Sequence, residues 1–198
     1  MDEADATTRD LARIAEQAAL TRERTPRGGT APPRAPSRDC GHFDIHIDRD
    51  GSWFHQGTPI NRASLVKLFS TVLERDEAGV YWLVTPVERG RITVDDAPFV
   101  AVEVDCRGEG PSQELIFRTN LGDFVTVDAD HPLRVATGDD GAPRPYVGIR
   151  NGLEARLARP VFYALVELGR EERVGDTTLF GVWSKNTFFP LGSLAEPS

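Results

Sequence analysis

Cysteine and lysine are both scarce in this sequence of 198 residues. The two cysteines, Cys40 and Cys106, lie far apart, which excludes a Cys-x-x-Cys redox or zinc pair and a disulfide framework. The sequence contains only two lysines but 21 arginines. A GC-rich genome explains this bias, so recognition of anions by the guanidinium fork can concern only a few of the arginines.

Long apolar runs are also lacking. The longest, residues 80–84 and 161–166, are far shorter than the about 20 residues of a membrane-spanning helix. The first 25 residues carry many charges and no apolar core of a signal peptide. We therefore expect a cytoplasmic protein with no membrane partner.

Motifs of the large enzyme classes are missing as well. The sequence holds no Walker A loop, no His-Glu-x-x-His and no Gly-x-Ser-x-Gly. Gly108 and Gly110 begin a dinucleotide-like pattern, but the third glycine is absent and Pro111 follows. We expect no cofactor and no reaction of these classes, while a catalytic triad assembled from distant residues stays open.

Acidic residues outnumber basic ones by 31 to 23, which gives a net charge of -8. The excess lies beyond residue 38, because residues 1–38 hold six acids and seven arginines. Affinity for nucleic acids comes mainly from Lys and Arg that neutralise phosphates. We therefore expect neither DNA nor RNA as a partner, and the charge leaves room for one small anion held locally.

Three segments differ in composition. Residues 8–22 have apolar positions at helical spacing and predict an amphipathic helix. Residues 22–38 contain four prolines and a Gly-Gly pair, a composition typical of an extended linker. The predicted organisation is a helix and linker at 1–38, an N-terminal α+β domain at 39–96 and a C-terminal domain at 97–198.

One pattern occurs twice in the body: a strand, a turn that ends in glycine, a second strand, a proline and an amphipathic helix. Gly51 and Pro59 belong to the first copy, and Gly152 and Pro160 follow at an offset of 101 residues. Agreement in order and spacing indicates an internal duplication.

The predicted fold class is α+β. The first helix follows from an apolar stripe at residues 65–73, with Asn61 as its N-cap, and the second runs from Pro160 to Gly169. The expected architecture is two tandem related domains of antiparallel hairpins, each with one helix, the second a curled sheet capped by its helix. Strands are predicted at residues 43–47, 53–56, 80–87, 91–94, 99–104, 114–119, 123–127, 133–136, 146–149 and 153–157.

A set of short motifs covers the body from residue 39 to residue 192. They are DGSWFH at 50–55, GTPINR at 57–62, LVKLF at 65–69, LVTPVE at 83–88, DAPF at 96–99, RTN at 118–120, DHP at 130–132, RNGLEA at 150–155 and FFPLG at 188–192. Together they resemble a bacterial family catalogued as a domain of unknown function. The resemblance implies two domains with repeated motifs and a C-terminal part similar to the pleckstrin-homology-like fold.

The same resemblance implies a small-ligand site where the two domains meet, for a nucleotide-based molecule in a signalling role. It carries no catalytic residues. Phosphoinositide binding, which the pleckstrin analogy would suggest, is disfavoured because the acidic second half shows no basic cluster along the sequence.

Polar residues of three types alternate with apolar ones between Cys40 and Asp50. Cys40, His42, Asp44, His46, Asp48 and Asp50 would share one face of a strand. Such a set could hold a transition metal, but neighbours on one face lie about 7 Å apart, so a compact site would need ligands from elsewhere. A strand with a solvated polar face explains the pattern, and we expect no metal.

Each helix start lies beside an arginine: Arg62 just inside the first, and Arg159 immediately before the second. Unpaired N–H groups at a helix start favour an anion, and an arginine adds a bidentate donor. We predict that Arg62, Arg159 and Arg150 grip the anion and that aromatic and polar side chains complete the site. The predicted site residues are Trp53, His55, Arg62, Glu88, Phe99, Asn120, His131, Arg150 and Arg159.

Two other functions remain open at this point. A hydrolase or transferase would use His55 or His131 with a neighbouring carboxylate, although a loop between strands is the simpler explanation of the Asp-His-Pro segment. A protein-interaction adaptor would instead expose a contiguous apolar patch of more than a few hundred Å². The leading hypothesis is a non-catalytic module that binds a small anionic ligand, and the sequence gives no prediction of its oligomeric state.

Overall fold

The computed structural model describes residues 11–20, 38–138, 140–175 and 177–193. The chain divides into two compact units, Met1–Asp96 and Ala97–Ser198. Residues 11–20 are helical, in agreement with the middle of the predicted helix, whose ends lie outside the described residues. The predicted linker also lies outside them, apart from Arg38, which begins the first strand.

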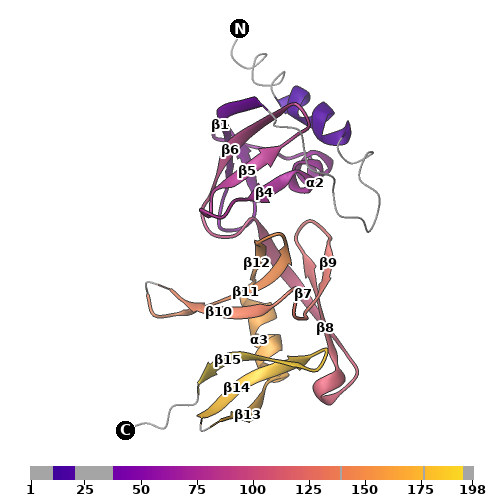
Figure 1. Ribbon diagram of the computed structural model, residues 1–198, viewed down its shortest axis with the longest axis vertical. Helices are drawn as coiled ribbons and strands as arrows, with labels where there is room; N and C mark the ends of the chain where they lie inside the picture. The colour runs from indigo at the N-terminus through magenta and orange to yellow at the C-terminus, as the bar shows by residue number, and fades with distance from the viewer. Residues whose placement is uncertain (1–10, 21–37, 139, 176, 194–198) are drawn as a thin grey trace. The chain divides into compact units, whose positions relative to one another are not determined.

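The first unit is built on a six-stranded sheet with the order β3-β2-β1-β6-β5-β4, accompanied by the helix α2 (Figure 1). Strand β1 pairs antiparallel with β2 and parallel with β6. The predicted hairpins did not include this parallel pair, which joins strands distant in sequence. The elements are β1 (Arg38–Ile47), β2 (Trp53–His55), β3 (Thr58–Pro59), α2 (Ala63–Thr71), β4 (Leu73–Arg75), β5 (Tyr81–Val84) and β6 (Glu88–Val94).

Alternation along β1 decides which face of this sheet is buried. Phe43, Ile45 and Ile47 are buried, and the polar residues that alternate with them belong to the other face. Trp53 of β2 lies opposite Ile47 and is also buried, with its ring 6.3 Å from that of Phe69 on α2. These contacts place α2 on the apolar face of the sheet.

Helix α2 is shorter than the apolar stripe predicts, and its start differs by one residue. Its N-cap is Arg62, so the prediction of Asn61 as cap and of Arg62 just inside the helix is wrong. Leu73 continues the stripe but belongs to β4, where it pairs with Leu83 across the sheet. Because Leu73 is buried in this strand, burial alone could not reveal where the helix ends.

The helix of residues 11–20 belongs to the first unit. Its Arg13 Nη1 donates to Glu88 Oε2 at 2.6 Å, and the Thr85 hydroxyl donates to Gln17 Oε1 at 2.8 Å. Ile14, the next residue along the helix, is buried. A segment that composition separates from the body is therefore tied to β6 and the residues before it.

The second unit contains a six-stranded sheet, a three-stranded sheet and the helix α3. The larger sheet has the order β10-β11-β12-β7-β8-β9, with β12 parallel to β7, and the smaller one is the meander β13-β14-β15. Helix α3 contacts β7 and β14, and so lies against strands of both sheets (Figure 1). The elements are β7 (Phe99–Arg107), η1 (Gly110–Ser112), β8 (Glu114–Thr119), β9 (Phe124–Thr126), β10 (Leu133–Thr137), β11 (Pro143–Arg150), β12 (Leu153–Leu157), α3 (Arg159–Glu167), β13 (Arg170–Val174), β14 (Thr177–Ser184) and β15 (Thr187–Ser193).

A hydroxyl joins the two sheets of the second unit. Ser184 Oγ accepts the backbone N–H of Leu115 at 3.1 Å and donates to the carbonyl of Val127 at 2.7 Å. Gln113 Nε2 adds a bond of 2.8 Å to the carbonyl of Trp183. Ser184 and Gln113 are buried and hydrogen-bonded, as buried polar groups must be to avoid a desolvation cost.

The α+β class is confirmed, and the repeated pattern has a counterpart in each unit. Strands β1 and β2 with α2, and strands β11 and β12 with α3, form a hairpin followed by a helix. Gly51 and Gly152 both sit in the hairpin turns at positive φ, 76° and 74°, where glycine avoids a steric penalty. The two sheets extend these hairpins differently, because β6 joins β1 whereas β7 joins β12.

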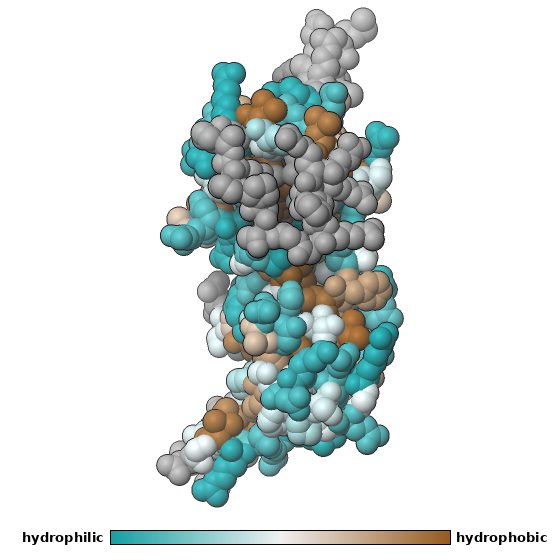
Figure 2. Space-filling model, turned by 45° about the vertical axis from the view of Figure 1, so that its right-hand side comes forward, coloured by the Kyte–Doolittle hydropathy of each residue, from teal (hydrophilic) through white to brown (hydrophobic). Residues whose placement is uncertain are grey.

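Exposed apolar side chains occur in several elements. On the face drawn in Figure 2, the hydrophobic patches are small and the hydrophilic residues cover more of the surface. Among the described residues, Phe124 is the most exposed large apolar side chain, at 71%. The others are Leu20, Val87, Val102, Tyr163, Val166 and Val174.

Candidate functional site

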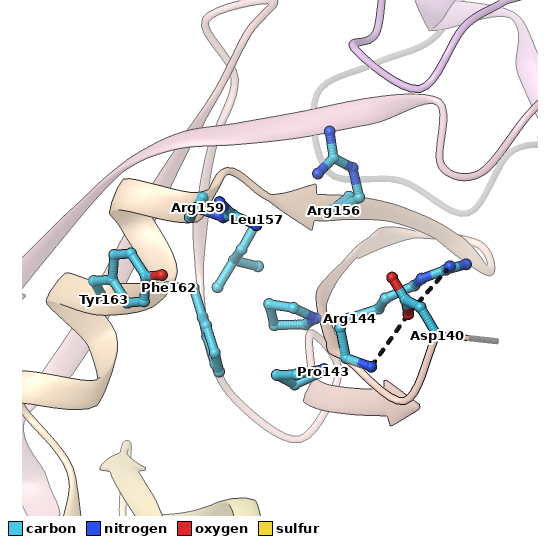
Figure 3. Close-up of a pocket in the computed structure, with 10 residues that line it drawn as sticks. Asp140, Pro143, Arg144, Arg156, Leu157, Arg159, Phe162 and Tyr163 are labelled. Carbon is cyan, nitrogen blue, oxygen red and sulfur yellow. Dashed lines mark hydrogen bonds and ion pairs between the residues drawn. The ribbon is translucent and has the colours of Figure 1, made fainter. Parts of the chain in front are cut away.

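A cavity of about 330 Å³ lies within the second unit, where three elements meet (Figure 3). One wall comes from the turn and first residues of the β10–β11 hairpin, one from the end of β12, and one from the first turns of α3. We call it the arginine cavity because three arginines line it. The lining residues are Asp140, Ala142, Pro143, Arg144, Pro145, Arg156, Leu157, Arg159, Phe162 and Tyr163.

The chain passes directly from one wall to the next where β12 ends. Leu157 closes the strand with a buried side chain, Ala158 is the extended N-cap, and Arg159 is the first helical residue. No side chain caps this helix, and Pro160 contributes no N–H. The backbone donors of the first turn therefore remain for another acceptor, and Arg159 extends from the same turn.

The β10–β11 hairpin supplies a loosely paired arginine. Arg144 Nη2 lies 3.8 Å from Asp140 Oδ1, too far for a hydrogen bond. The same Asp140 oxygen accepts the Ala142 N–H at 3.1 Å, which fixes the carboxylate in the turn (Figure 3). Gly138 makes this arrangement possible, because a Cβ there would collide with Arg144 and Asp140.

The charges of the cavity favour an anion. Among the described residues that line the cavity, three are arginines and one is an aspartate, in a protein whose net charge is -8. Figure 3 shows the ring of Phe162 and the side chain of Pro143 on one side, with the guanidinium of Arg156 pointing the other way. The apolar part of the lining and the Arg156 guanidinium therefore lie on different sides.

Sequence reasoning identified Arg159 but missed Arg144 and Arg156. Arg159 stood out because it lies at a helix start, where a local pattern suggests an anion site. Arg144 and Arg156 occupy polar positions of alternating strands, so in the sequence they resemble any solvated sheet face. The second half has no basic cluster along the sequence, but the fold brings these three arginines to the lining of one cavity.

The other predicted residues of the second unit lie elsewhere, two of them in contact with each other. The Arg150 guanidinium lies over the ring of Phe99, 5.3 Å from its centroid, and Phe99 is fully buried. Burial lowers the pKa of Arg150, while the charge of Asp123 opposes that shift. Asn120 Oδ1 accepts the N–H of Val100 at 3.1 Å, a contact that holds the end of β7.

His131 forms a close pair with a carboxylate. Its Nδ1 lies 2.9 Å from Asp128 Oδ1, which also accepts the His131 backbone N–H at 2.8 Å. Burial would raise the pKa of Asp128, but the hydrogen bonds and charge of His131 outweigh burial and lower it. An aspartate could orient this ring as a general base. However, the two hydrogen bonds that Asp128 makes, to the ring and to the backbone of His131, are also typical of a turn stabilised by its own aspartate.

The predicted residues of the first unit are mostly structural. Trp53 and His55 lie on the buried face of the sheet, at 2% and 6% exposure. Arg62 is exposed and precedes α2. Glu88 is buried, and besides Arg13 its Oε2 accepts the Cys40 thiol at 3.4 Å. Desolvation and the Glu88 carboxylate raise the pKa of Cys40, which keeps it a thiol.

The polar face of β1 is used by neighbouring strands. His46 Nε2 lies 2.9 Å from Asp95 Oδ1, and His42 Nε2 lies 3.4 Å from the Thr93 hydroxyl. His46 also stacks on Phe54, with 5.8 Å between ring centroids. Over the described ranges, no three His, Cys, Asp or Glu side chains group closely enough to hold a metal ion.

Models of one family account for most of the chain. The description "Domain of unknown function (DUF1285), N-terminal domain" matches residues 34–97, and "Protein of unknown function (DUF1285), C-terminal domain" matches residues 98–191. The chain belongs to the DUF1285 family. This confirms the family resemblance read from the motifs.

Two solved DUF1285 structures resemble this chain. A family protein from Silicibacter pomeroyi DSS-3 is 44% identical, with 89% of this chain and 95% of that chain covered and a TM-score of 0.75. One from Shewanella baltica OS155 is 30% identical, with 63% and 91% covered and a TM-score of 0.52. No curated protein matches.

DUF1285 membership establishes the two-domain architecture and no activity. The pleckstrin-homology-like character of the second unit and a ligand site shared by the two domains stay predictions. Within the described part of this family member, no helix has the length and hydropathy needed to cross a bilayer.

Proposed function

We propose that this protein is a regulatory module that binds a small anionic ligand, including nucleotide-derived phosphates, in the arginine cavity. The observation that carries the proposal is the placement of Arg144, Arg156 and Arg159, from three different elements, around one cavity of about 330 Å³. Like charges gathered in this way repel one another, and a bound anion removes the repulsion while accepting charge-assisted hydrogen bonds.

The size of the cavity supports a small molecule. Ligand pockets in proteins usually measure about 300–1,000 Å³, so the cavity lies at the lower end of that range. Its lining mixes apolar side chains with a few charged ones, the usual composition of such pockets.

The chemistry of the lining supports binding rather than catalysis. The described residues around the cavity include no Ser, Thr, Cys, Lys or His. Guanidinium groups stay protonated at neutral pH, so they hold an anion without exchanging protons with it. A signalling or regulatory role follows if the protein holds its ligand and releases it unchanged.

Calorimetric titration with inorganic pyrophosphate, at low and constant ionic strength, tests the proposal. We expect saturable binding to the wild-type protein and at least tenfold weaker binding to Arg159→Gln and Arg144→Gln, because each variant loses a charge-assisted contact of about 1.5–3 kcal/mol. At 100 times its Kd the ligand should stabilise the wild-type fold by about 2.7 kcal/mol.

Arg107→Gln is the matched control. Arg107 lies in the same unit, is 69% exposed and pairs with Asp105 at 3.2 Å, outside the cavity lining. Its loss should leave the affinity unchanged. Equal weakening in all three variants would show general charge attraction, and no saturable binding to the wild type would remove the proposed function.

A further inference from the structure

The sheet of the first unit carries a charged group on its buried face. Glu88, Gly90 and Ile92 are the buried positions along β6, so the Glu88 carboxylate lies on the same face as the apolar side chains. Only 4% of that side chain is exposed. Removing a carboxylate from water is costly unless a cation pairs with it. Whatever covers this part of the sheet must therefore bring a positive charge.

The helix that covers this part of the sheet brings that charge. Arg13 Nη1 donates to Glu88 Oε2 at 2.6 Å, and the Thr85 hydroxyl donates to Gln17 Oε1 at 2.8 Å. The Cys40 thiol donates to the same Glu88 oxygen at 3.4 Å. We call Cys40, Thr85 and Glu88 the docking surface.

Two apolar residues of the helix complete the contact. Ile14 follows Arg13 directly and Ala18 follows Gln17, and both are almost fully buried. Their spacing of four residues puts them on one side of the helix. The docking surface thus recognises a short pattern: an arginine, an aliphatic residue directly after it, and a small residue four positions further.

The Glu88 carboxylate can accept more than the helix gives it. Its Oε2 accepts from both Arg13 and Cys40, whereas Oε1 is buried and has no hydrogen-bond partner within the described residues. A guanidinium can present two parallel N–H groups to the two oxygens of a carboxylate. An arginine that reached both oxygens would bind this carboxylate more tightly than Arg13 does, because a buried acceptor without a partner is unfavourable.

The helix itself is short and has few buried side chains. It spans residues 11–20 in the described part of the chain, and isolated helices shorter than about 12–15 residues are marginal in water. The side chain of Arg13 is half exposed, and so is Leu20. The helical structure therefore depends on the docking surface and is lost when another group takes that place.

The docking surface and the helix also differ in their relation to the family. The N-terminal domain model of DUF1285 matches residues 34–97, which include the docking surface and exclude the helix. Residues 21–37 connect the helix to β1. A helix attached in this way is an intramolecular ligand, and the connecting chain sets its effective concentration. A helix from another molecule can compete with it.

We propose that the docking surface is a recognition site for an amphipathic helix of a partner protein, and that residues 11–20 occupy it as an intramolecular ligand which the partner displaces. The partner helix carries an arginine that reaches both oxygens of Glu88, an aliphatic residue in the place of Ile14 and a small one in that of Ala18. A second copy of this chain offers only the same helix, which has no advantage over the intramolecular one.

Fluorescence anisotropy with a labelled synthetic peptide of residues 8–22 tests displacement on the full chain. The wild-type chain should bind the peptide weakly, because its own helix occupies the docking surface. We expect at least tenfold tighter binding to Arg13→Ala and to Ile14→Ala, whose own helices compete less. A damaged fold would not produce this gain, and Ile14→Ala retains the pair between Arg13 and Glu88. Glu16→Ala, at an exposed position of the same helix, is the matched control and should bind as the wild type does.

Substitutions in the peptide test which residues are recognised. With the Ile14→Ala chain as receptor, a peptide carrying Arg13→Ala should bind at least tenfold more weakly than the unchanged peptide, because it brings no cation to Glu88. A peptide carrying Glu16→Ala should bind like the unchanged one. Adding Glu88→Gln to the receptor should also weaken binding of the unchanged peptide at least tenfold.

Each part of the proposal can fail separately. Equal peptide affinities for the wild type and both variants, or no binding to either variant, would overturn the intramolecular ligand. Equal affinities of the peptides with and without Arg13 would overturn the requirement for arginine. A wild-type dimer at micromolar concentration that dissociates when the peptide is added would assign the docking surface to a second copy and overturn the partner helix. None of these results bears on the arginine cavity, so the proposed function is tested independently.

Discussion

The buried carboxylate of Glu88 helps to hold the helix of residues 11–20 on the first unit, and the effect of removing its partner Arg13 can be predicted quantitatively. The Glu88 side chain is 4% exposed, whereas that of its partner Arg13 is 49% exposed. Arg13→Ala leaves the carboxylate buried without its cation, which costs about 3–5 kcal/mol when both partners are buried. Because the Arg13 side chain is half exposed to water, we expect Arg13→Ala to lower the free energy of unfolding by about 2–3 kcal/mol.

The free energy that Arg13→Ala can cost has an upper limit, which is the energy with which the helix is docked on the sheet. If the helix detaches, water reaches Glu88 and the penalty stops growing. Ile14 and Ala18 are the buried apolar residues of the helix, and burying one isoleucine contributes about 1.5–3 kcal/mol. The penalty and the docking energy are therefore similar, so we expect Arg13→Ala to detach the helix while the sheet remains folded.

Hydrogen exchange and urea unfolding measure these two effects. The amides of residues 11–20 should lose their protection in Arg13→Ala and keep it in Glu16→Ala, an exposed position on the same helix. Glu88→Gln should be milder, since a neutral amide tolerates burial better than a carboxylate. A double-mutant cycle that shows additive effects for Arg13 and Glu88, or unchanged protection in Arg13→Ala, would refute the reasoning.

Three further variants test other parts of the account. Asp128→Asn should reduce the free energy of unfolding at neutral pH. Because the pKa of Asp128 is lowered in the folded protein, the ionised carboxylate paired with His131 contributes stability above pH 3.8. The difference from wild type should therefore shrink as the pH falls below 3.8 and the carboxylate is protonated. Gly90→Ala should lower the free energy of unfolding by about 1–3 kcal/mol, because the new Cβ would lie 2.6 Å from the ring of Phe43, and an unchanged urea midpoint would contradict this close packing. Asn120→Ala should lower the free energy of unfolding by about 1 kcal/mol, because it removes one hydrogen bond to β7. The affinity for phosphate should stay unchanged in this variant. Weaker phosphate binding would place Asn120 at a ligand site.

Local patterns in the sequence predicted local structure well. Strands β8 and β12 occupy the predicted residues, and the alternation of Phe43, Ile45 and Ile47 identified the buried face of β1. The helix end at Thr71 was missed because Leu73 satisfies both a helical stripe and a strand pair with Leu83. Either conformation buries that residue, so hydrophobicity could not decide between them.

Contacts between distant segments were the part that local patterns could not supply. The parallel pairs β1–β6 and β12–β7 join strands that no short motif connects. The arginine cavity depends on the second of these, since β12 carries Arg156 and leads directly into Arg159. Arg144 reaches the cavity only because the β10–β11 hairpin folds back toward the start of α3. The site is assembled from three elements, and only Arg159, at a helix start, could be recognised from the sequence.

The central claim, an anion held by Arg144, Arg156 and Arg159, can be tested on these side chains directly. NMR spectra of the arginine Nε–Hε groups during a titration with inorganic pyrophosphate would follow each guanidinium separately. The account predicts that these three resonances shift along one saturable curve, while those of Arg107 and Arg118, which pair with Asp105 and Glu103 outside the cavity, stay in place. Shifts that grow linearly and equally for all five arginines, or none at the three, would contradict it.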